Sequence, residues 1–350
     1  MTTKDQTTTR LPKSTFRHAA TVAATLALLA SATAAHAGEI MLVNAFDQSI
    51  SRLVTYQYTA DGSGNFSASS RTTLAVNDYN GWVVDGPSTG TVPYKFGFQG
   101  TGLTKYTSTG AQPVQYTSGN NVVINPQMQA VESSSGTVYL RNDNRSNNYY
   151  GQFGIAAVTP SGAFSVVTTT QGNGLAIGPD GYLYQANWTQ GSTGSIEKFS
   201  TSGTDLGQFA AYSGSTPTEL AFDSNGNLFG LVNGTRLDEW SSTGTYMGTF
   251  KSGLPATLVC CSNAPNTFAI DSNDNFWWSQ GAGSLYKITP GGTVSTFDFS
   301  SSGIQARSVA ILDTGNAAPE PSTGLLIAGT GLLLAGRSRK LAQRLNKSGL

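Results

Sequence analysis

The chain has 350 residues, of which only 11% are charged, 41 are glycine and 10% are aromatic. The aromatic and aliphatic residues suffice for a core, so the composition excludes a disordered chain and is typical of an exported, β-rich protein. The formal net charge is zero, but residues 38–318 include 18 acidic and 11 basic side chains, a net charge of −7. This stretch contains no basic patch with interleaved aromatic residues, which argues against nucleic acid as a partner.

Residues 1–37 have the pattern of a secretory signal peptide. An apolar segment, 19–32, follows a cationic region, and Ala35 and Ala37 are the small residues that signal peptidase requires before a cut. The cationic region contains Lys4, Arg10, Lys13 and Arg17. We expect cleavage before Gly38. A permanent N-terminal transmembrane helix is the alternative, for which this apolar segment is short because a spanning helix needs about 20 residues.

From residue 38 onward, glycine-punctuated β structure repeats along the chain. The clearest repeated unit is an apolar residue, then Ser or Thr, then two residues and a glycine. Its copies end at Gly62, Gly110, Gly162, Gly203, Gly244 and Gly292, which are 41 to 52 residues apart. Such a sequence suits a hairpin turn whose glycine has a left-handed conformation.

A second unit precedes the first in the later copies and predicts a strand, a tight Asx or Gly turn and another strand. It covers 175–184, 220–229 and 268–277, with a degenerate copy at 128–140. Together the two units give four short strands in each repeat. That content and that period are typical of a propeller blade.

We therefore predict an all-β fold, a six-bladed β-propeller over residues 38–316. Segment 306–313 resembles a strand with no partner after it, and 39–44 resembles one with no partner before it. We expect the two to pair in one composite blade, which closes the ring and removes exposed sheet edges. The repeat is weakest in 76–123, so a separate N-terminal β-sandwich of residues 38–125 is the alternative.

The sequence offers few residues that could carry out catalysis. His18 and His36 are the only histidines and both lie in the expected signal peptide, so the body lacks histidine for a triad or a metal cluster. Turns 223–227 and 271–275 resemble the start of a calcium loop but lack the glutamate of an EF-hand. The repeat favours Asx turns there. We expect no catalytic residue, no metal ligand and no cofactor, with calcium as the only candidate metal.

The two cysteines, Cys260 and Cys261, are adjacent. Export would permit their oxidation. A vicinal disulfide, a reduced buried pair and an intermolecular link all stay open.

The repeat also suggests a ligand-binding rim. Four residues fall at matching ends of the second strands, and with Trp278 they are expected to surround one mouth of the channel. The four are Asn142, Asn187, Trp188 and Gln280. Tryptophan and asparagine suit a carbohydrate, through ring stacking and hydrogen bonds to hydroxyls. Packing of the tryptophans between blades is the alternative.

Residues 317–350 form a segment in three parts. Pro319, Glu320 and Pro321 should be extended and accessible, because proline fixes φ and lacks a backbone donor. The uncharged apolar run 324–336 has 13 residues, fewer than the roughly 20 that span a bilayer. The basic residues that follow should stay on the cytoplasmic side. They are Arg337, Arg339, Lys340, Arg344 and Lys347.

This order of parts resembles the PEP-CTERM sorting signal of Gram-negative, biofilm-forming bacteria, with Ser338 interrupting the basic cluster. The resemblance implies recognition by an exosortase, transient insertion of 324–336 in the inner membrane, and removal of the tail. The protein would then reach the cell surface or the extracellular matrix. An ordinary C-terminal membrane anchor is the alternative.

The repeats between residues 175 and 277 are similar to the NHL and gluconolactonase-like propellers. The resemblance implies a structural or binding body that associates with exopolysaccharide or another envelope polymer. One alternative is a metal-dependent gluconolactonase-like hydrolase, whose Glu, Asn and Asp over the central channel cannot be matched to positions here. An inert repeat spacer is another, since propellers serve all three purposes.

Overall fold

The computed structural model describes residues 39–76, 82–83, 94–97, 102–105, 114–117, 126–142, 154–187, 193–254, 267–279, 283–299 and 303–313. Regular structure in these ranges consists of strands and one short 3-10 helix, Ala68–Ser70. No helix within them is long and apolar enough to cross a membrane. The signal peptide with its cleavage site, the sorting segment 317–350 and the pair Cys260 and Cys261 lie outside the described residues, so those expectations stay predictions.

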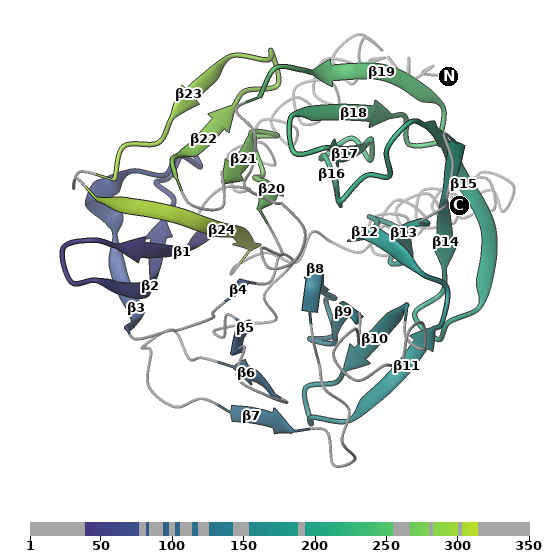
Figure 1. Cartoon of the computed structure of the whole chain (residues 1–350), viewed down its shortest axis with the longest axis horizontal. Helices are drawn as coiled ribbons and strands as arrows, with labels where there is room; N and C mark the ends of the chain where they lie inside the picture. The colour runs from purple at the N-terminus through teal and green to yellow at the C-terminus, as the bar shows by residue number, and fades with distance from the viewer. Residues whose placement is uncertain are drawn as a thin grey trace, which may run out of the picture.

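The strands pair into antiparallel sheets of four that follow one another around a central axis (Figure 1). Five blades are described with their packed side chains. The composite blade consists, in pairing order, of β24 (Ile304–Asp313), β1 (Glu39–Asp47), β2 (Arg52–Thr59) and β3 (Thr72–Val76). The next two described blades along the chain consist of β8 (Pro126–Glu132), β9 (Val138–Asn142), β10 (Ile155–Val158) and β11 (Phe164–Thr168), and of β12 (Gly172–Ile177), β13 (Leu183–Asn187), β14 (Thr193–Phe199) and β15 (Asp205–Ser213). The last two consist of β16 (Glu219–Phe222), β17 (Leu228–Val232), β18 (Arg236–Trp240) and β19 (Tyr246–Lys251), and of β20 (Phe268–Ile270), β21 (Phe276–Ser279), β22 (Leu285–Ile288) and β23 (Val294–Thr296).

The remaining sector of the ring holds a sheet of much shorter strands. These are β4 (Trp82–Val83), β5 (Tyr94–Gly97), β6 (Gly102–Lys105) and β7 (Val114–Thr117), described by their backbone pairing alone. The all-β propeller prediction is confirmed. The structure shows five fully developed blades rather than the predicted six, because this sector has only strands of two to four residues.

The ring closes through the composite blade, as predicted. β24 pairs antiparallel with β1, and Glu39 lies opposite Asp313 at one end of the ladder. Figure 1 shows these strands, from the two ends of the described chain, side by side. The alternative of a separate N-terminal sandwich is wrong, because β1 to β3 share a sheet with the C-terminal strand.

The repeated Ser/Thr-x-x-Gly turn joins the third and fourth strands of a blade. In the copy between β14 and β15, the Gly203 N–H donates to the Ser200 carbonyl, and Gly203 has a φ of +91°. Gly244 repeats this geometry with a φ of +84°. A Cβ atom on Gly203 would overlap the Val167 carbonyl, and one on Gly244 the Phe209 carbonyl, each in the preceding blade. Both conformation and inter-blade packing therefore require glycine at these two positions.

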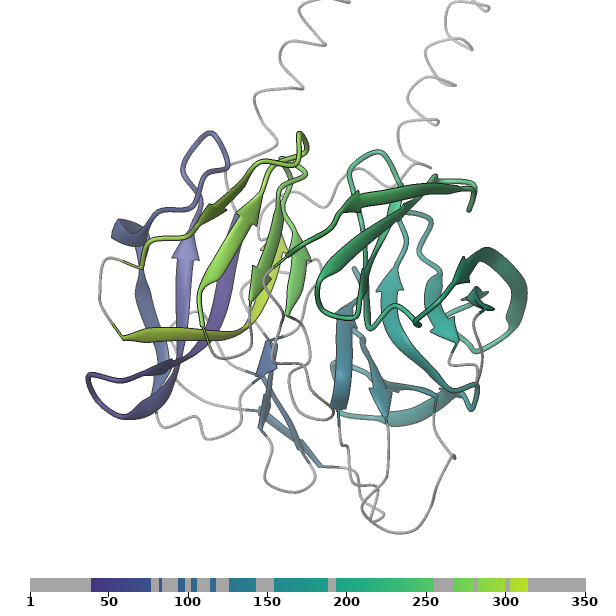
Figure 2. The same ribbon diagram turned by 45° about the horizontal axis from the view of Figure 1, so that its top comes forward.

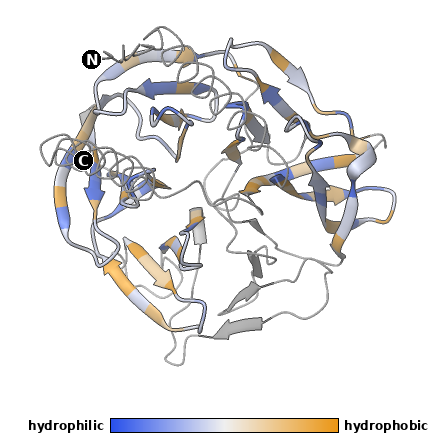
Figure 3. Cartoon of the chain, turned by 180° about the vertical axis from the view of Figure 1, so that it is seen from behind, coloured by the Kyte–Doolittle hydropathy of each residue, from blue (hydrophilic) through white to orange (hydrophobic). Residues whose placement is uncertain are grey.

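Neighbouring sheets stand face to face around the ring, as the tilted view in Figure 2 shows. The middle strands β10, β17 and β21 are buried along their whole length. Trp240 packs between the β12–β15 and β16–β19 blades, and Trp277 between the β20–β23 blade and the composite blade. Figure 3 accordingly shows hydrophobic segments spread over the coloured blades rather than gathered in one centre. Burial on both faces explains why the sequence lacks clean two-residue alternation.

Candidate functional site

The ring has two ends with different chemistry. We call the end where the first strand of a blade turns into the second the turn face. The turns from third to fourth strand lie at the same end, since first and third strands run in the same direction. The opposite end, where second strands end and third strands begin, is the loop face. Glu39 and Asp313 lie at the turn face.

The carboxylates of Asp271 and Asp223 at the turn face are committed to Asx turns. Asp271 accepts the backbone N–H groups of Asn273 and Asn275, at 3.0 and 2.8 Å, and the indole N–H of Trp277 at 2.7 Å. Asp223 accepts the corresponding N–H groups of its own turn, as predicted for an Asx turn. A calcium loop must direct several oxygens at one point, whereas backbone and side-chain N–H groups surround these oxygens. The turns therefore do not fit a calcium ion.

Asp180 forms a more exposed cluster on the same face. It accepts the Tyr184 hydroxyl at 2.7 Å and pairs with the Lys198 ammonium at 2.7 Å. Burial raises the pKa of Asp180, but the hydrogen bonds from Lys198 and Tyr184 outweigh it and hold that pKa below its ordinary value. Burial, followed by the hydrogen bond to Asp180, raises the pKa of Tyr184 to about 12. This cluster joins the first-to-second strand turn to β14.

Carboxylate clamps link the turns of successive blades. Asp274 accepts the backbone N–H and the hydroxyl of Ser224, both at 2.7 Å. Glu39 accepts the same two groups of Ser272 in the next turn of the ring. Each clamp places a carboxylate on the serine of the preceding blade. These acids therefore stabilise the ring rather than surround a reaction centre.

The buried carboxylate of Glu219 links two neighbouring blades at the loop face. Its carboxylate accepts the backbone N–H groups of Thr267 and Phe268, both at 3.0 Å, and the Thr267 hydroxyl. It thereby joins β16 to the start of β20 near the centre of the ring. Within the described residues no group of three His, Cys, Asp or Glu side chains is placed to share a metal ion.

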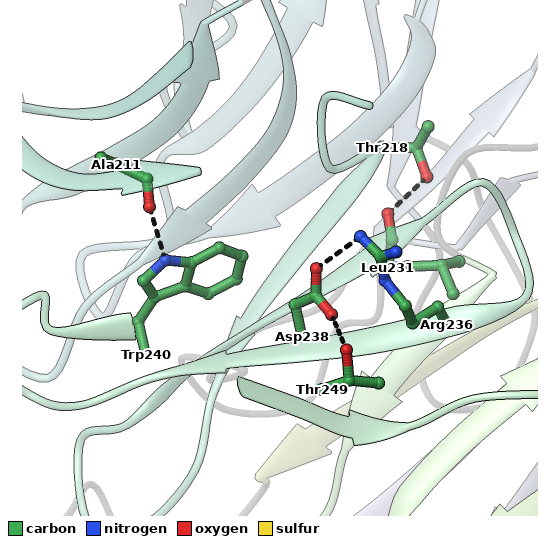
Figure 4. Close-up of polar contacts among 7 residues, drawn as sticks. All are labelled: Ala211, Thr218, Leu231, Arg236, Asp238, Trp240 and Thr249. Atoms are coloured by element: carbon green, nitrogen blue, oxygen red, sulfur yellow. Dashed lines mark hydrogen bonds and ion pairs between the residues drawn. The ribbon is translucent and has the colours of Figure 1, made fainter. Parts of the chain in front are cut away.

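An ion pair lies at the loop-face end of β18 (Figure 4). Arg236 donates to the buried Asp238 carboxylate at 2.8 Å, and the Thr249 hydroxyl donates to the other oxygen at 2.9 Å. The Arg236 side chain is 36% exposed. A buried carboxylate thus holds the partly exposed Arg236 side chain in a fixed orientation.

The predicted rim residues do not all lie where the sequence placed them. Asn142 and Asn187 end β9 and β13 at the loop face, and their place at the channel rim stays a prediction. Trp278 is fully buried and packs with Phe268 and Leu231 between two blades, so the prediction that it lines the channel mouth is wrong. Trp188 and Gln280 lie outside the described residues.

Two polar residues that sequence reasoning missed lie between the β8–β11 and β12–β15 blades. Arg141 is 8% exposed and lies opposite Ile155 in the ladder of β9 and β10. Gln185 is fully buried and lies opposite Leu175 in the ladder of β12 and β13. Ile155 and Leu175 belong to one apolar cluster between these blades. Directly paired residues point to the same side of a sheet, so both polar side chains point into this interface. Aligning the second strands would have revealed them, because Gln185 occupies the position of Leu140, Gly230 and Trp278.

By sequence the chain matches no protein-family model and no curated protein. By structure it matches a chain of a nidogen/laminin complex with a TM-score of 0.57 and 13% identity, over 79% of this chain and 99% of that one. A gluconolactonase from Xanthomonas campestris gives 0.47 at 14% identity, over 78% and 87% of the two chains. A virginiamycin B lyase from Staphylococcus aureus gives 0.45 at 16% identity, over 65% and 72%. The first match shows that the chain has the β-propeller fold. At 13% identity that match defines the fold alone.

Proposed function

We propose that this chain is an exported β-propeller that an exosortase-type system sorts to the cell surface or extracellular matrix of a Gram-negative bacterium. There it binds exopolysaccharide through the loop face and has a structural rather than a catalytic role. Signal peptidase acts first, residues 324–336 hold an inner-membrane intermediate, and the exosortase then acts at Pro319-Glu320-Pro321. The sequence of the two terminal segments motivates each step.

The observation that carries the sorting proposal is the pairing of Glu39 with Asp313. The ring is complete between these two residues, and the expected cleavage positions lie outside it at both ends. Cutting before Gly38 and near Pro321 therefore leaves every described strand in place. A fold that depended on either segment would argue against processing.

The positions of polar residues at the loop face support the binding part of the proposal. Asn142 and Asn187 end neighbouring second strands there, and the Arg236 side chain at the start of β18 is 36% exposed. Amide and guanidinium groups suit the hydroxyl and acid groups of polysaccharides. The turn face, by contrast, uses its carboxylates for Asx turns and clamps.

The intact mass of the exported protein tests the sorting proposal. We expect a species that lacks 1–37 and most of 322–350. The control carries Pro319→Ala and Pro321→Ala, which should leave the apolar run attached and the protein in the inner membrane. Native material that is intact to Leu350 and remains in the inner membrane would overturn the proposal.

The metal-dependent hydrolase alternative is tested separately. Metal analysis of the purified protein should find no stoichiometric calcium or zinc, and a lactone substrate should not be turned over. One firmly bound ion in each molecule, together with metal-dependent lactone hydrolysis, would replace the non-enzymatic proposal.

A further inference from the structure

The side chain of Gln185 belongs to the buried polar groups without a hydrogen-bond partner in the described chain. It is fully buried, and neither Oε1 nor Nε2 has a hydrogen-bond partner. The Oδ1 atom of Asn187, two residues further along the same side of β13, is also buried without a partner. Leaving a buried polar group unpaired costs roughly 1–3 kcal/mol, so the unpaired Gln185 amide lowers the stability of the fold.

The backbone opposite makes room for this amide. Gly172 pairs with Asn187, and the register of β12 shifts between Gly172 and Leu175. A Cβ atom on Gly172 would overlap Cγ of Gln185. An irregular ladder and a missing side chain thus accommodate Gln185, and bulges of this kind often adjoin functional sites.

The chemistry of this place combines donors, acceptors and positive charge. Gln185 offers one amide donor group and one acceptor, Asn187 offers an acceptor, and Arg141 points into the same interface from β9 with a guanidinium. Toward the turn face, the interface is closed by apolar side chains that include Leu183 and Phe199. A ligand therefore has to enter from the loop face.

The charge at the loop-face end of this interface favours an acidic ligand. Arg52, Arg141 and Arg236 lie at the loop-face ends of their strands. The aspartates of the turns lie at the opposite end and are Asp61, Asp180, Asp223, Asp271 and Asp274. Asp47, Glu219 and Asp238 also lie near the loop-face ends of their strands, on other blades, so those arginines do not make the whole face positive. Among the described side chains at the loop-face end of this interface, Arg141 is the charged one, and its planar guanidinium suits the geometry of a carboxylate.

We propose that the loop-face end of the interface between the β8–β11 and β12–β15 blades binds a uronic acid unit of an acidic polysaccharide, through Gln185, Asn187 and Arg141. The sugar hydroxyls pair with the two amides, and the carboxylate pairs with the guanidinium. The inference rests on the proposed function and adds the class of polymer and the residues that select it.

Calorimetric titration of the full chain with oligogalacturonate, and with a neutral galactose oligomer of the same length, tests the proposal. The wild type should bind the acidic oligomer at least tenfold more tightly than the neutral one. Gln185→Leu should weaken oligogalacturonate binding at least tenfold, because it keeps the bulk but removes both polar atoms. The control Gln208→Leu changes an exposed glutamine on β15 of the same blade and should leave binding unchanged.

Each outcome separates the two proposals. Equal binding of oligogalacturonate by Gln185→Leu and wild type would overturn the site, and equal binding of acidic and neutral oligomers would overturn the acidic class, while the proposed function stands. Failure of the wild type to bind any oligosaccharide would overturn the polymer-binding function as well. If Gln185→Leu does not fold, nuclear magnetic resonance of wild-type side-chain amides decides, since oligogalacturonate must shift the Gln185 signal and an unchanged signal rejects the site.

Discussion

The carboxylate of Glu39 accepts two hydrogen bonds from Ser272, from the backbone N–H at 2.7 Å and from the hydroxyl at 3.0 Å. The residues are 233 positions apart in the chain. Glu39 is only 6% exposed, so water does not easily replace the carboxylate. The contact ties the composite blade to its neighbour at the point where the ring closes.

Glu39→Gln should therefore lower the free energy of unfolding by about 1–2 kcal/mol, since it replaces one charged acceptor with a donor that faces other donors. Urea unfolding followed by tryptophan fluorescence measures the change. The control is Glu239→Gln on β18, where burial and the nearby charge of Asp223 raise the carboxyl pKa. It should be neutral or slightly stabilising. Equal effects of both variants would show that the clamp does not hold the ring.

Asp274 combines a clamp with a conformation that non-glycine residues rarely adopt. Its φ is +57°, and its counterpart in the preceding blade is Gly226, with a φ of +80°. Asp274→Gly loses the hydrogen bonds to Ser224 but removes the strain, whereas Asp274→Ala loses the bonds and keeps the strain. Because a left-handed conformation costs a non-glycine residue roughly 1–2 kcal/mol, the alanine variant should be less stable than the glycine variant by about that amount. Thermal unfolding of the two gives the difference, and a more stable alanine variant would contradict it.

The glycines of the Ser/Thr-x-x-Gly turns should differ in their tolerance of alanine. Gly244→Ala adds left-handed strain and an overlap with the Phe209 carbonyl, so it should cost about 2–5 kcal/mol. Gly292 has a φ of +76°, but a Cβ atom there would meet nothing within 4 Å. Gly292→Ala should cost about 1–2 kcal/mol. Chemical denaturation of both variants checks the order, and a larger loss for Gly292→Ala would reject the packing argument.

Alkaline pH should weaken the fold partly through Tyr184. Burial first, and then the hydrogen bond to Asp180, raises its pKa to about 12 from the ordinary value of 10.0. The folded state holds the phenolic proton more tightly than the unfolded chain. This contribution to stability is therefore complete below pH 10 and is lost as the pH rises through about 12.

Tyr184→Phe should accordingly show a shallower decline of stability over that range, measured by urea unfolding at successive pH values. A residual decline should persist, because burial also raises the pKa values of Tyr56 and Tyr58. The control Tyr246→Phe removes an exposed hydroxyl and should keep the parent slope. If the stability of Tyr184→Phe declined with pH as steeply as that of the parent protein, Tyr184 would not be a source of the alkaline destabilisation.

The sequence was informative wherever a residue acts within its own repeat. The turn glycines, such as Gly203, and the Asx turn of Asp271 follow from local conformational preferences, which recur at each copy and can be read in order. The pairing of β24 with β1 was also predictable, because each segment lacked a partner of its own. Closure was the arrangement that satisfied both.

Contacts between blades were not predictable in the same way. Ser224 and Asp274 are 50 residues apart, and the period fixes which strands exist but not which side chains meet across two sheets. Trp278 illustrates the limit, since a tryptophan on a second strand suits a channel rim and an inter-blade core equally well. The sequence of the short strands β4 to β7 has no strong repeat pattern. The predicted number of six blades was therefore wrong in this sector.

The pairing of Glu39 with Asp313 has a mechanical consequence. The two strands are antiparallel and their free ends emerge together, so tension between the N-terminal and C-terminal extensions loads the backbone hydrogen bonds one at a time rather than all at once. The bond nearest the extensions breaks first and the rest follow in sequence, as in a peeled hairpin. A pull from both ends therefore unseals the ring at low force.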